Sequence, residues 1–151
     1  SAYVTLNLME GVTESGSGQR LRHSWAKGNA VYEDAVTGYP YAFENPIAGK
    51  TGTTQNNSDG WFMGMVPNLA TGVWVGGEDR STHFEGIAYG QGATMALPIW
   101  ALYMKQCYAT PELAISAEEF PKPDVLTIET DCSVYGKALN QGVDLGNELD
   151  F

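Results

Sequence analysis

Three short apolar segments separated by two polar turns lie in the first half of the sequence, and they constrain the fold most strongly. The segments cover residues 47–54, 61–66 and 71–76, and the turns contain Asn56-Asn57-Ser58-Asp59-Gly60 and Pro67-Asn68-Leu69-Ala70. Connections this short join antiparallel neighbours, whereas parallel strands need a crossover of about a dozen residues or more. The sequence therefore predicts a three-stranded antiparallel meander.

Apolar residues at helical spacing predict two helices, one on each side of these segments. The first covers Tyr3 to about Gly11, and the second runs from Thr94 to about Tyr108, with Pro98 in its first turn. Glycine and proline interrupt residues 19–46 and 77–92, so we expect loops there, with room for one short hairpin in the first. Together these elements define an α+β class, an antiparallel sheet flanked by helices.

The chain divides into two parts at about residue 110. We expect residues 1–110 to form the folded part, because all the periodic segments lie there. Residues 111–151 are polar and acidic with little periodicity, and we interpret them as a loosely ordered C-terminal extension. No signal peptide precedes Ser1, so the chain is either cytosolic or preceded by a targeting segment upstream.

Charge and composition exclude several partners and cofactors. The chain carries 18 acidic and 8 basic residues, a net charge of −10 that repels nucleic acid and anionic lipid. No run of about 18 apolar residues exists, so no membrane segment is expected. Cys107, Cys132, His23 and His83 fit no metal or redox spacing, so we expect no metal and no cofactor. A packed Cys107 and a loop Cys132 are expected, with a disulfide between them as the alternative.

Lys50-Thr51-Gly52-Thr53 is the motif with the clearest chemistry. On a strand, Thr51 and Thr53 project to one face, so both hydroxyls can bind one carboxylate, while Gly52 on the other face permits close packing. An edge strand beside a cleft can also offer backbone N–H groups to a substrate oxyanion, and Lys50 adds positive potential. Taken alone the motif is short, and an ordinary strand with an exposed lysine is the alternative.

A longer set of motifs accompanies Lys50-Thr51-Gly52-Thr53 along the chain. The motifs are Leu8-Met9-Glu10-Gly11-Val12, Gly16-Ser17-Gly18, Pro46 to Thr54, Asp59 to Gly64, Pro67-Asn68-Leu69, Gly72 to Gly76 and Ala96-Leu97-Pro98-Ile99-Trp100. In this order they resemble the class A (bifunctional) penicillin-binding proteins. The resemblance runs from about Tyr3 to Tyr108 and points to the C-terminal part of the transpeptidase domain, a partial penicillin-binding/β-lactamase-like fold.

The resemblance implies a serine-type D,D-transpeptidase of peptidoglycan biosynthesis. In this family a residue matching Lys50 sets the electrostatics around the nucleophile, and we take it as the catalytic residue here. Residues matching Thr51 and Thr53, with Gly52 between them, bind the carboxylate of the stem peptide or of a β-lactam. The backbone N–H at Thr53 would form half of the oxyanion hole. The implied location is the cell envelope, at the periplasmic face of the inner membrane.

The family's nucleophile motifs have no counterpart in the expected order. Ser-x-x-Lys and Ser-x-Asn should precede Lys-Thr-Gly, yet no Ser-x-Asn occurs. The string Ser24-Trp25-Ala26-Lys27 lacks the helical periodicity that such a nucleophile needs. We therefore expect a fragment that is inactive alone, and a homodimer is one way to cover its exposed apolar surface.

Two other interpretations remain open at this stage. One is a non-catalytic module that binds peptidoglycan or a protein partner, and the other is a relative of the serine β-lactamases or carboxypeptidases. A Ser-x-x-Lys and Ser-x-Asn pair upstream would favour an enzyme. Trp61, Trp74 and Trp100 are expected to pack rather than to bind, and so are the aromatic residues of 19–44.

Overall fold

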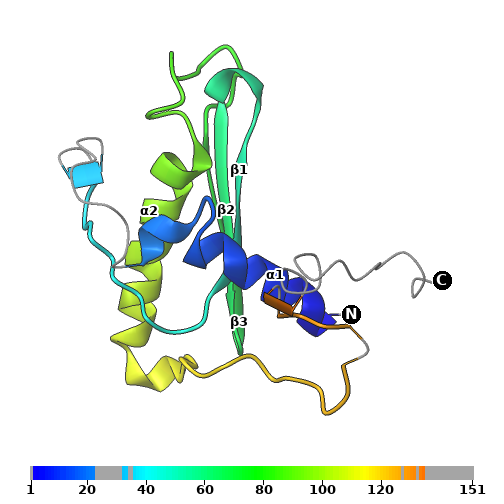
Figure 1. Cartoon of the computed structure of the whole chain (residues 1–151). Helices are drawn as coiled ribbons and strands as arrows, with labels where there is room; N and C mark the ends of the chain where they lie inside the picture. The colour runs from blue at the N-terminus through cyan, green and yellow to red at the C-terminus, as the bar shows by residue number, and fades with distance from the viewer. Residues whose placement is uncertain (1, 23–31, 34–35, 127, 132, 135–151) are drawn as a thin grey trace, which may run out of the picture. The chain divides into compact units, whose positions relative to one another are not determined.

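The computed structural model describes residues 2–22, 32–33, 36–126, 128–131 and 133–134. The contacts within the chain define two compact units, Ser1–Pro121 and Lys122–Phe151. All the helices and strands discussed below belong to the first unit (Figure 1). Among the described residues, no helix is both long enough and apolar enough to cross a membrane.

The predicted three-stranded meander is confirmed. β1 (Ala48–Thr53), β2 (Asp59–Val66) and β3 (Leu69–Gly76) form one antiparallel sheet in the order β1-β2-β3 (Figure 1). The short 3-10 helix η3 (Gln55–Asn57) connects β1 to β2. β2 and β3 each begin two residues earlier than predicted, because strand pairing continues into residues that the sequence pattern assigned to turns.

Both predicted helices are present, and the first is longer than expected. α1 (Ala2–Glu14) contacts β1 and ends in a tight turn. The N–H of Gly18 donates to the carbonyl oxygen of Val12 at 2.9 Å, which closes the end of the helix. A Cβ atom at Gly16 would lie 2.8 Å from the Cα of Val12, so this position requires glycine.

α2 (Gly92–Tyr108) covers one face of the sheet (Figure 1). It begins two residues earlier than predicted, so Pro98 lies in its second turn, and the prediction that it lies in the first was wrong. The helix start follows from close packing on the sheet, because a Cβ atom at Gly92 would overlap the carbonyl oxygen of Gly52. Among the described residues of 19–46 there is the short helix η1 (Gln19–Leu21) and no strand.

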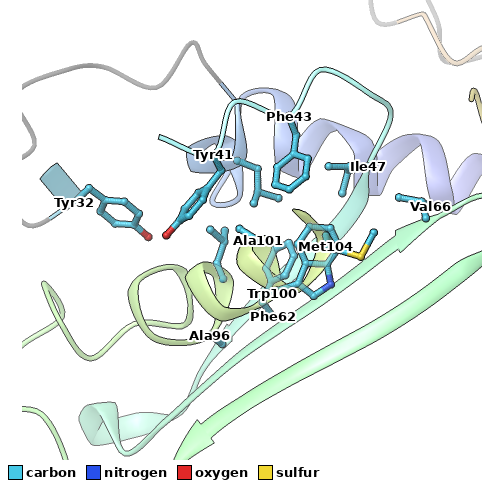
Figure 2. Close-up of a cluster of buried hydrophobic side chains, with 12 residues drawn as sticks. Tyr32, Tyr41, Phe43, Ile47, Phe62, Val66, Ala96, Trp100, Ala101 and Met104 are labelled. Atoms are coloured by element: carbon cyan, nitrogen blue, oxygen red, sulfur yellow. The ribbon is translucent and has the colours of Figure 1, made fainter. Parts of the chain in front are cut away.

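The hydrophobic core lies around α2: Phe62 packs on the helix from the sheet, while Tyr41 and Phe43 pack on it from the segment before β1, as Figure 2 shows. Phe62 and the fully buried Trp100 form an edge-to-face pair with ring centroids 5.1 Å apart. The indole N–H of Trp100 donates to the hydroxyl of Thr71 at 2.7 Å, so its polar group is satisfied. Packing is thus confirmed for Trp100, whereas Trp61 and Trp74 pair with each other on the other, half-exposed face of the sheet.

A buried polar hub connects the end of α1 with the loop that leads to β1. Arg22 is almost fully buried, and its guanidinium donates to the carbonyl oxygens of Phe43 and Asn45 at 3.2 and 2.6 Å. It also donates to the hydroxyl of Thr13 at 3.0 Å, and that hydroxyl donates to the carbonyl oxygen of Ile47 at 2.7 Å. The hub therefore fixes the position from which β1 starts.

The segment after α2 folds back onto the turn between β2 and β3. The side-chain amide of Asn68 donates to the carbonyl oxygen of Ala114 at 2.8 Å and accepts from the N–H of Ser116 at 2.9 Å. Residues 111–121 thus belong with the first unit. Cys107 is buried as expected, while Cys132 lies outside the described residues.

Candidate functional site

The Lys-Thr-Gly-Thr motif forms the last four residues of β1. The register places Thr51 opposite Phe62 and Thr53 opposite Gly60, so both threonines lie on the same face, as the strand period predicts. Gly52 lies on the opposite face, where a Cβ atom would stand 3.1 Å from the Cβ of Trp61. The absence of a side chain at Gly52 therefore lets Trp61 of β2 pack closely against β1.

The backbone of β1 is open on the side away from β2. In the described sheet β1 is an edge strand, and the N–H of Thr54 donates to the carbonyl oxygen of Asp59 at 3.1 Å. Hydrogen-bonded and non-hydrogen-bonded pairs alternate along an antiparallel ladder. Because Thr54 and Asp59 form a hydrogen-bonded pair, Thr53 and Thr51 belong to non-hydrogen-bonded pairs, and their backbone N–H groups point away from β2, to the open edge. These donors are placed where a ligand beside β1 can reach them.

Both threonine hydroxyls contact other elements of the fold. The hydroxyl oxygens of Thr51 and Ser17 lie 2.7 Å apart, and Ser17 belongs to the turn after α1. The hydroxyl of Thr53 accepts a hydrogen bond from the N–H of Gly92, the first residue of α2, at 3.0 Å. This N–H is one of the helix-terminal donors that lack a partner within the helix. Thr53 keeps its hydroxyl proton for an external acceptor.

Lys50 lies on the face opposite the two threonines, yet its ammonium group returns to the same edge. The side chain is exposed, and its Nζ donates to the carbonyl oxygen of Thr51 at 3.0 Å. A positive charge therefore stands beside the open backbone of the motif. The structure thus brings Lys50, Thr51 and Thr53 together, with Gly52 between them.

A second polar group lies near the start of α2, and the sequence pattern did not point to it. The guanidinium of Arg20 lies 4.7 Å from the ring centre of Tyr32 and donates to the side-chain oxygen of Gln91 at 3.4 Å. Burial raises the pKa of Tyr32 to about 12, partly opposed by Arg20 and by a hydrogen bond with Thr94. Tyr32 is therefore a neutral phenol at physiological pH.

Three other candidate features do not involve the described residues of β1. An apolar cavity of about 380 Å³ at one end of the sheet is lined in part by Val75, Phe84 and Met95, and not by the motif. Ser24-Trp25-Ala26-Lys27 lies outside the described residues. Within the part of the chain that the structure describes, no group of three or more His, Cys, Asp or Glu residues is arranged to hold a metal ion.

No protein-family model matches the sequence. Penicillin-binding protein 1A of Escherichia coli is 33% identical to it over 108 residues, which cover 64% of this chain and 12% of that protein. The protein of the same name from Aquifex aeolicus is 38% identical over 92 residues, covering 56% of this chain and 12% of the relative. The Neisseria meningitidis relative is 44% identical over 59 residues, covering 39% and 7%.

The chain thus spans 12% or less of the length of these relatives. Identities of 33–44% over segments of 59–108 residues agree with the ordered motifs found in the sequence. These similarities support a fragment of a class A penicillin-binding protein.

Proposed function

We propose that this chain forms one wall of the transpeptidase site of a penicillin-binding protein and that the nucleophilic serine lies outside these residues. The observation that supports the proposal best is the geometry of the edge strand. Thr51 and Thr53 share one face, and the backbone N–H of Thr53 points to the open side of β1. One strand can therefore offer donors both to the terminal carboxylate and to the scissile carbonyl oxygen of an acyl-D-Ala-D-Ala group.

The proposed reaction is acyl transfer through a serine ester. The serine attacks the carbonyl carbon between the two D-Ala residues, D-Ala leaves as the amine, and an amino group of a neighbouring stem peptide then takes the acyl group. In this scheme the hydroxyls of Thr51 and Thr53 donate to the terminal carboxylate. The backbone N–H of Thr53 donates to the oxyanion that forms during attack. No cofactor is required.

Lys50 provides positive potential at the edge of β1, in a chain that is acidic as a whole. The net charge of −10 repels an anionic stem peptide or penicillin at long range. The ammonium group of Lys50 stands at the edge of β1, on the carbonyl oxygen of Thr51. A local cation at that edge favours the substrate carboxylate and the deprotonated form of a nearby nucleophile.

Location and assembly follow as further parts of the proposal. A transpeptidase acts on peptidoglycan, so the protein would work at the periplasmic face of the inner membrane. Trp61, Met63 and Trp74 are each 44–47% exposed on one sheet face. Such a surface supports self-association of the 151-residue chain. Gel filtration that gives a monomer at every concentration would contradict this part.

The test uses the longer protein that contains this chain, together with a labelled penicillin. We expect Thr51→Val and Thr53→Val to lower the second-order rate of acylation about tenfold or more, because each removes a hydrogen bond to a charged group. Thr110→Val, at the far end of α2, is the control and should acylate like the unmodified protein. Unchanged acylation in both β1 variants would contradict the proposed role of this strand.

The same assay separates the other interpretations. A longer protein that binds peptidoglycan and is never acylated would be a non-catalytic module. A protein that is acylated and then rapidly hydrolyses the ester, with turnover of the penicillin, would be a β-lactamase. A stable adduct together with release of D-Ala from a stem peptide supports the transpeptidase.

A further inference from the structure

The hydroxyls of Ser17 and Thr51 form a contact that neither stability nor the proposed chemistry explains by itself. They lie 2.7 Å apart although the residues are 34 positions apart in the sequence, and the contact is exposed. Water can replace either partner there, so a hydrogen bond of this kind contributes little to stability. Its location beside the proposed carboxylate site indicates another role.

Ser17 is presented to β1 by a turn of fixed shape. It lies between Gly16 and Gly18, and the N–H of Gly18 is bonded to the carbonyl oxygen of Val12. A Cβ atom at Gly16 would meet the backbone of Val12 at 2.8 Å, so only glycine permits this turn. The Ser17 hydroxyl therefore has a defined position relative to α1.

The end of α1 is in turn fixed relative to β1. The hydroxyl of Thr13 donates to the carbonyl oxygen of Ile47 at 2.7 Å in a fully buried contact. Four residues further along each segment, Ser17 meets Thr51. The contact between Ser17 and Thr51 thus continues the interface between α1 and β1, and it joins two short side chains.

The chemistry of a carboxylate decides the direction of this hydrogen bond when a substrate is bound. A carboxylate only accepts, so Thr51 must donate its single hydroxyl proton to it. Ser17 must then donate to the oxygen of Thr51. The hydroxyl of Thr53 is oriented in the same way: it accepts from the N–H of Gly92, which can only donate, and its own proton can go to the substrate. Each threonine would receive one hydrogen bond from the protein and give one to the substrate.

We infer that Ser17 is a positioning residue that holds the Thr51 hydroxyl ready to donate to the carboxylate of the substrate. The inference rests on the proposed transpeptidase function. A threonine side chain on a strand has more than one allowed χ1 rotamer, and a fixed donor at its oxygen selects one. Preorganisation of this kind lowers the entropy cost of binding the carboxylate.

The first test measures the Thr51 side chain in the 151-residue chain by NMR. Three-bond couplings to its γ-methyl carbon report χ1 directly. We expect one rotamer in the unmodified chain and in Ser17→Thr, which keeps a hydroxyl, and averaging between rotamers in Ser17→Ala. Ser15→Ala, in the same turn, is the control and should leave Thr51 unchanged. A single Thr51 rotamer in Ser17→Ala would overturn the inference.

The second test measures acylation of the longer protein by benzylpenicillin, which carries the carboxylate. We expect Ser17→Ala to weaken the non-covalent complex about 3- to 10-fold, the effect of one hydrogen bond. The rate of the acylation step itself should stay within about twofold, because the interaction is made before and during reaction alike. Ser17→Thr should restore binding, whereas a variant that merely lost structure would not be rescued.

The outcomes distinguish this inference from the function on which it rests. If the unmodified longer protein is never acylated, the proposed function fails and the role of Ser17 fails with it. If the unmodified protein is acylated and Ser17→Ala binds benzylpenicillin equally well, only the inference is overturned. Thermal unfolding of each variant should match that of the unmodified chain, because the Ser17 contact is exposed.

Discussion

The hydroxyl of Thr13, in the last turn of α1, donates a hydrogen bond of 2.7 Å to the carbonyl oxygen of Ile47, the residue just before β1. The same hydroxyl accepts from the buried guanidinium of Arg22 at 3.0 Å. A single oxygen thus connects a helix, a loop and the strand that carries the Lys-Thr-Gly motif. The position of the candidate site depends on this buried contact.

Thr13→Val should destabilise the chain by about 2 kcal/mol. The substitution keeps the shape of the side chain but leaves the carbonyl oxygen of Ile47 and one N–H of Arg22 without this partner in a buried place. Urea-induced unfolding measures the change. Thr13→Ser retains the hydroxyl and should lose much less stability. A Thr13→Val variant as stable as the unmodified chain would contradict the role of this hydrogen bond, and a loss of stability in Thr13→Ser alone would assign the effect to the methyl group.

Arg22→Met should destabilise the chain by about 3 kcal/mol. The guanidinium is buried, forms an ion pair with Glu14 and donates to two backbone carbonyl oxygens. Removing it leaves these acceptors unsatisfied, and buried unsatisfied groups are among the costliest changes. Arg80→Met, at an exposed position, is the matched control and should change stability by less than about 0.5 kcal/mol. Similar losses of stability in the two variants would contradict the stabilising role of the buried Arg22 contacts.

Gly64→Ala should destabilise the sheet by about 2–3 kcal/mol, a typical cost of overpacking a core. A Cβ atom at Gly64 would overlap the indole ring of Trp100, which is fully buried. Gly86→Ala supplies the matched control, because no heavy atom lies within 4 Å of a Cβ atom there. Thermal unfolding compares the two. A stable Gly64→Ala variant would mean that α2 does not sit on the sheet as described.

Glu10→Gln should stabilise the chain at pH 7 and have no effect near pH 4. Burial, then repulsion from Glu119 and Glu14, raises the pKa of Glu10 above 4.5, and Arg22 partly opposes the shift. The folded state binds the proton of the Glu10 carboxyl more tightly than the unfolded state does. The contribution of protonated Glu10 to the free energy of unfolding is therefore fully present below pH 4.5, and it is lost as the pH rises through the raised pKa.

The expected gain for Glu10→Gln at pH 7 is small. Glu10 is half-exposed, and relief of the repulsion from Glu14 one helical turn away is worth about 0.2–0.5 kcal/mol. Unfolding curves at pH 4, 5.5 and 7 measure it, with Glu112→Gln, an exposed residue after α2, as the control. A gain that is equal at pH 4 and pH 7 would contradict the titration of Glu10.

Local patterns predicted the elements of this fold well because those elements are defined locally. The strands follow from apolar segments bounded by turn residues, and α2 follows from apolar residues at helical spacing. The start of α2 was missed because it is set by contact rather than by propensity. Gly92 lies against the backbone of Gly52, and the helix therefore begins two residues before the start that was predicted from Pro98 and the apolar spacing.

Part of the candidate site also follows from local sequence patterns, and the rest depends on contacts between residues far apart in the sequence. The shared face of Thr51 and Thr53 follows from the two-residue period of a strand. Ser17 and Gly92, which hold those hydroxyls, are 34 and 39 residues away from them and follow from no local pattern. Arg22 was missed for another reason, since arginine is rarely buried and nothing in its neighbours marks it as an exception.

The measurement that tests the central claim most directly is the intact mass of this 151-residue chain after incubation with benzylpenicillin, beside that of the longer protein. The account predicts no adduct on the chain alone and one penicilloyl adduct on the longer protein, at a serine outside these residues. A stoichiometric adduct on the chain alone, at Ser24 or any other of its serines, would contradict the claim that the chain holds only one wall of the site.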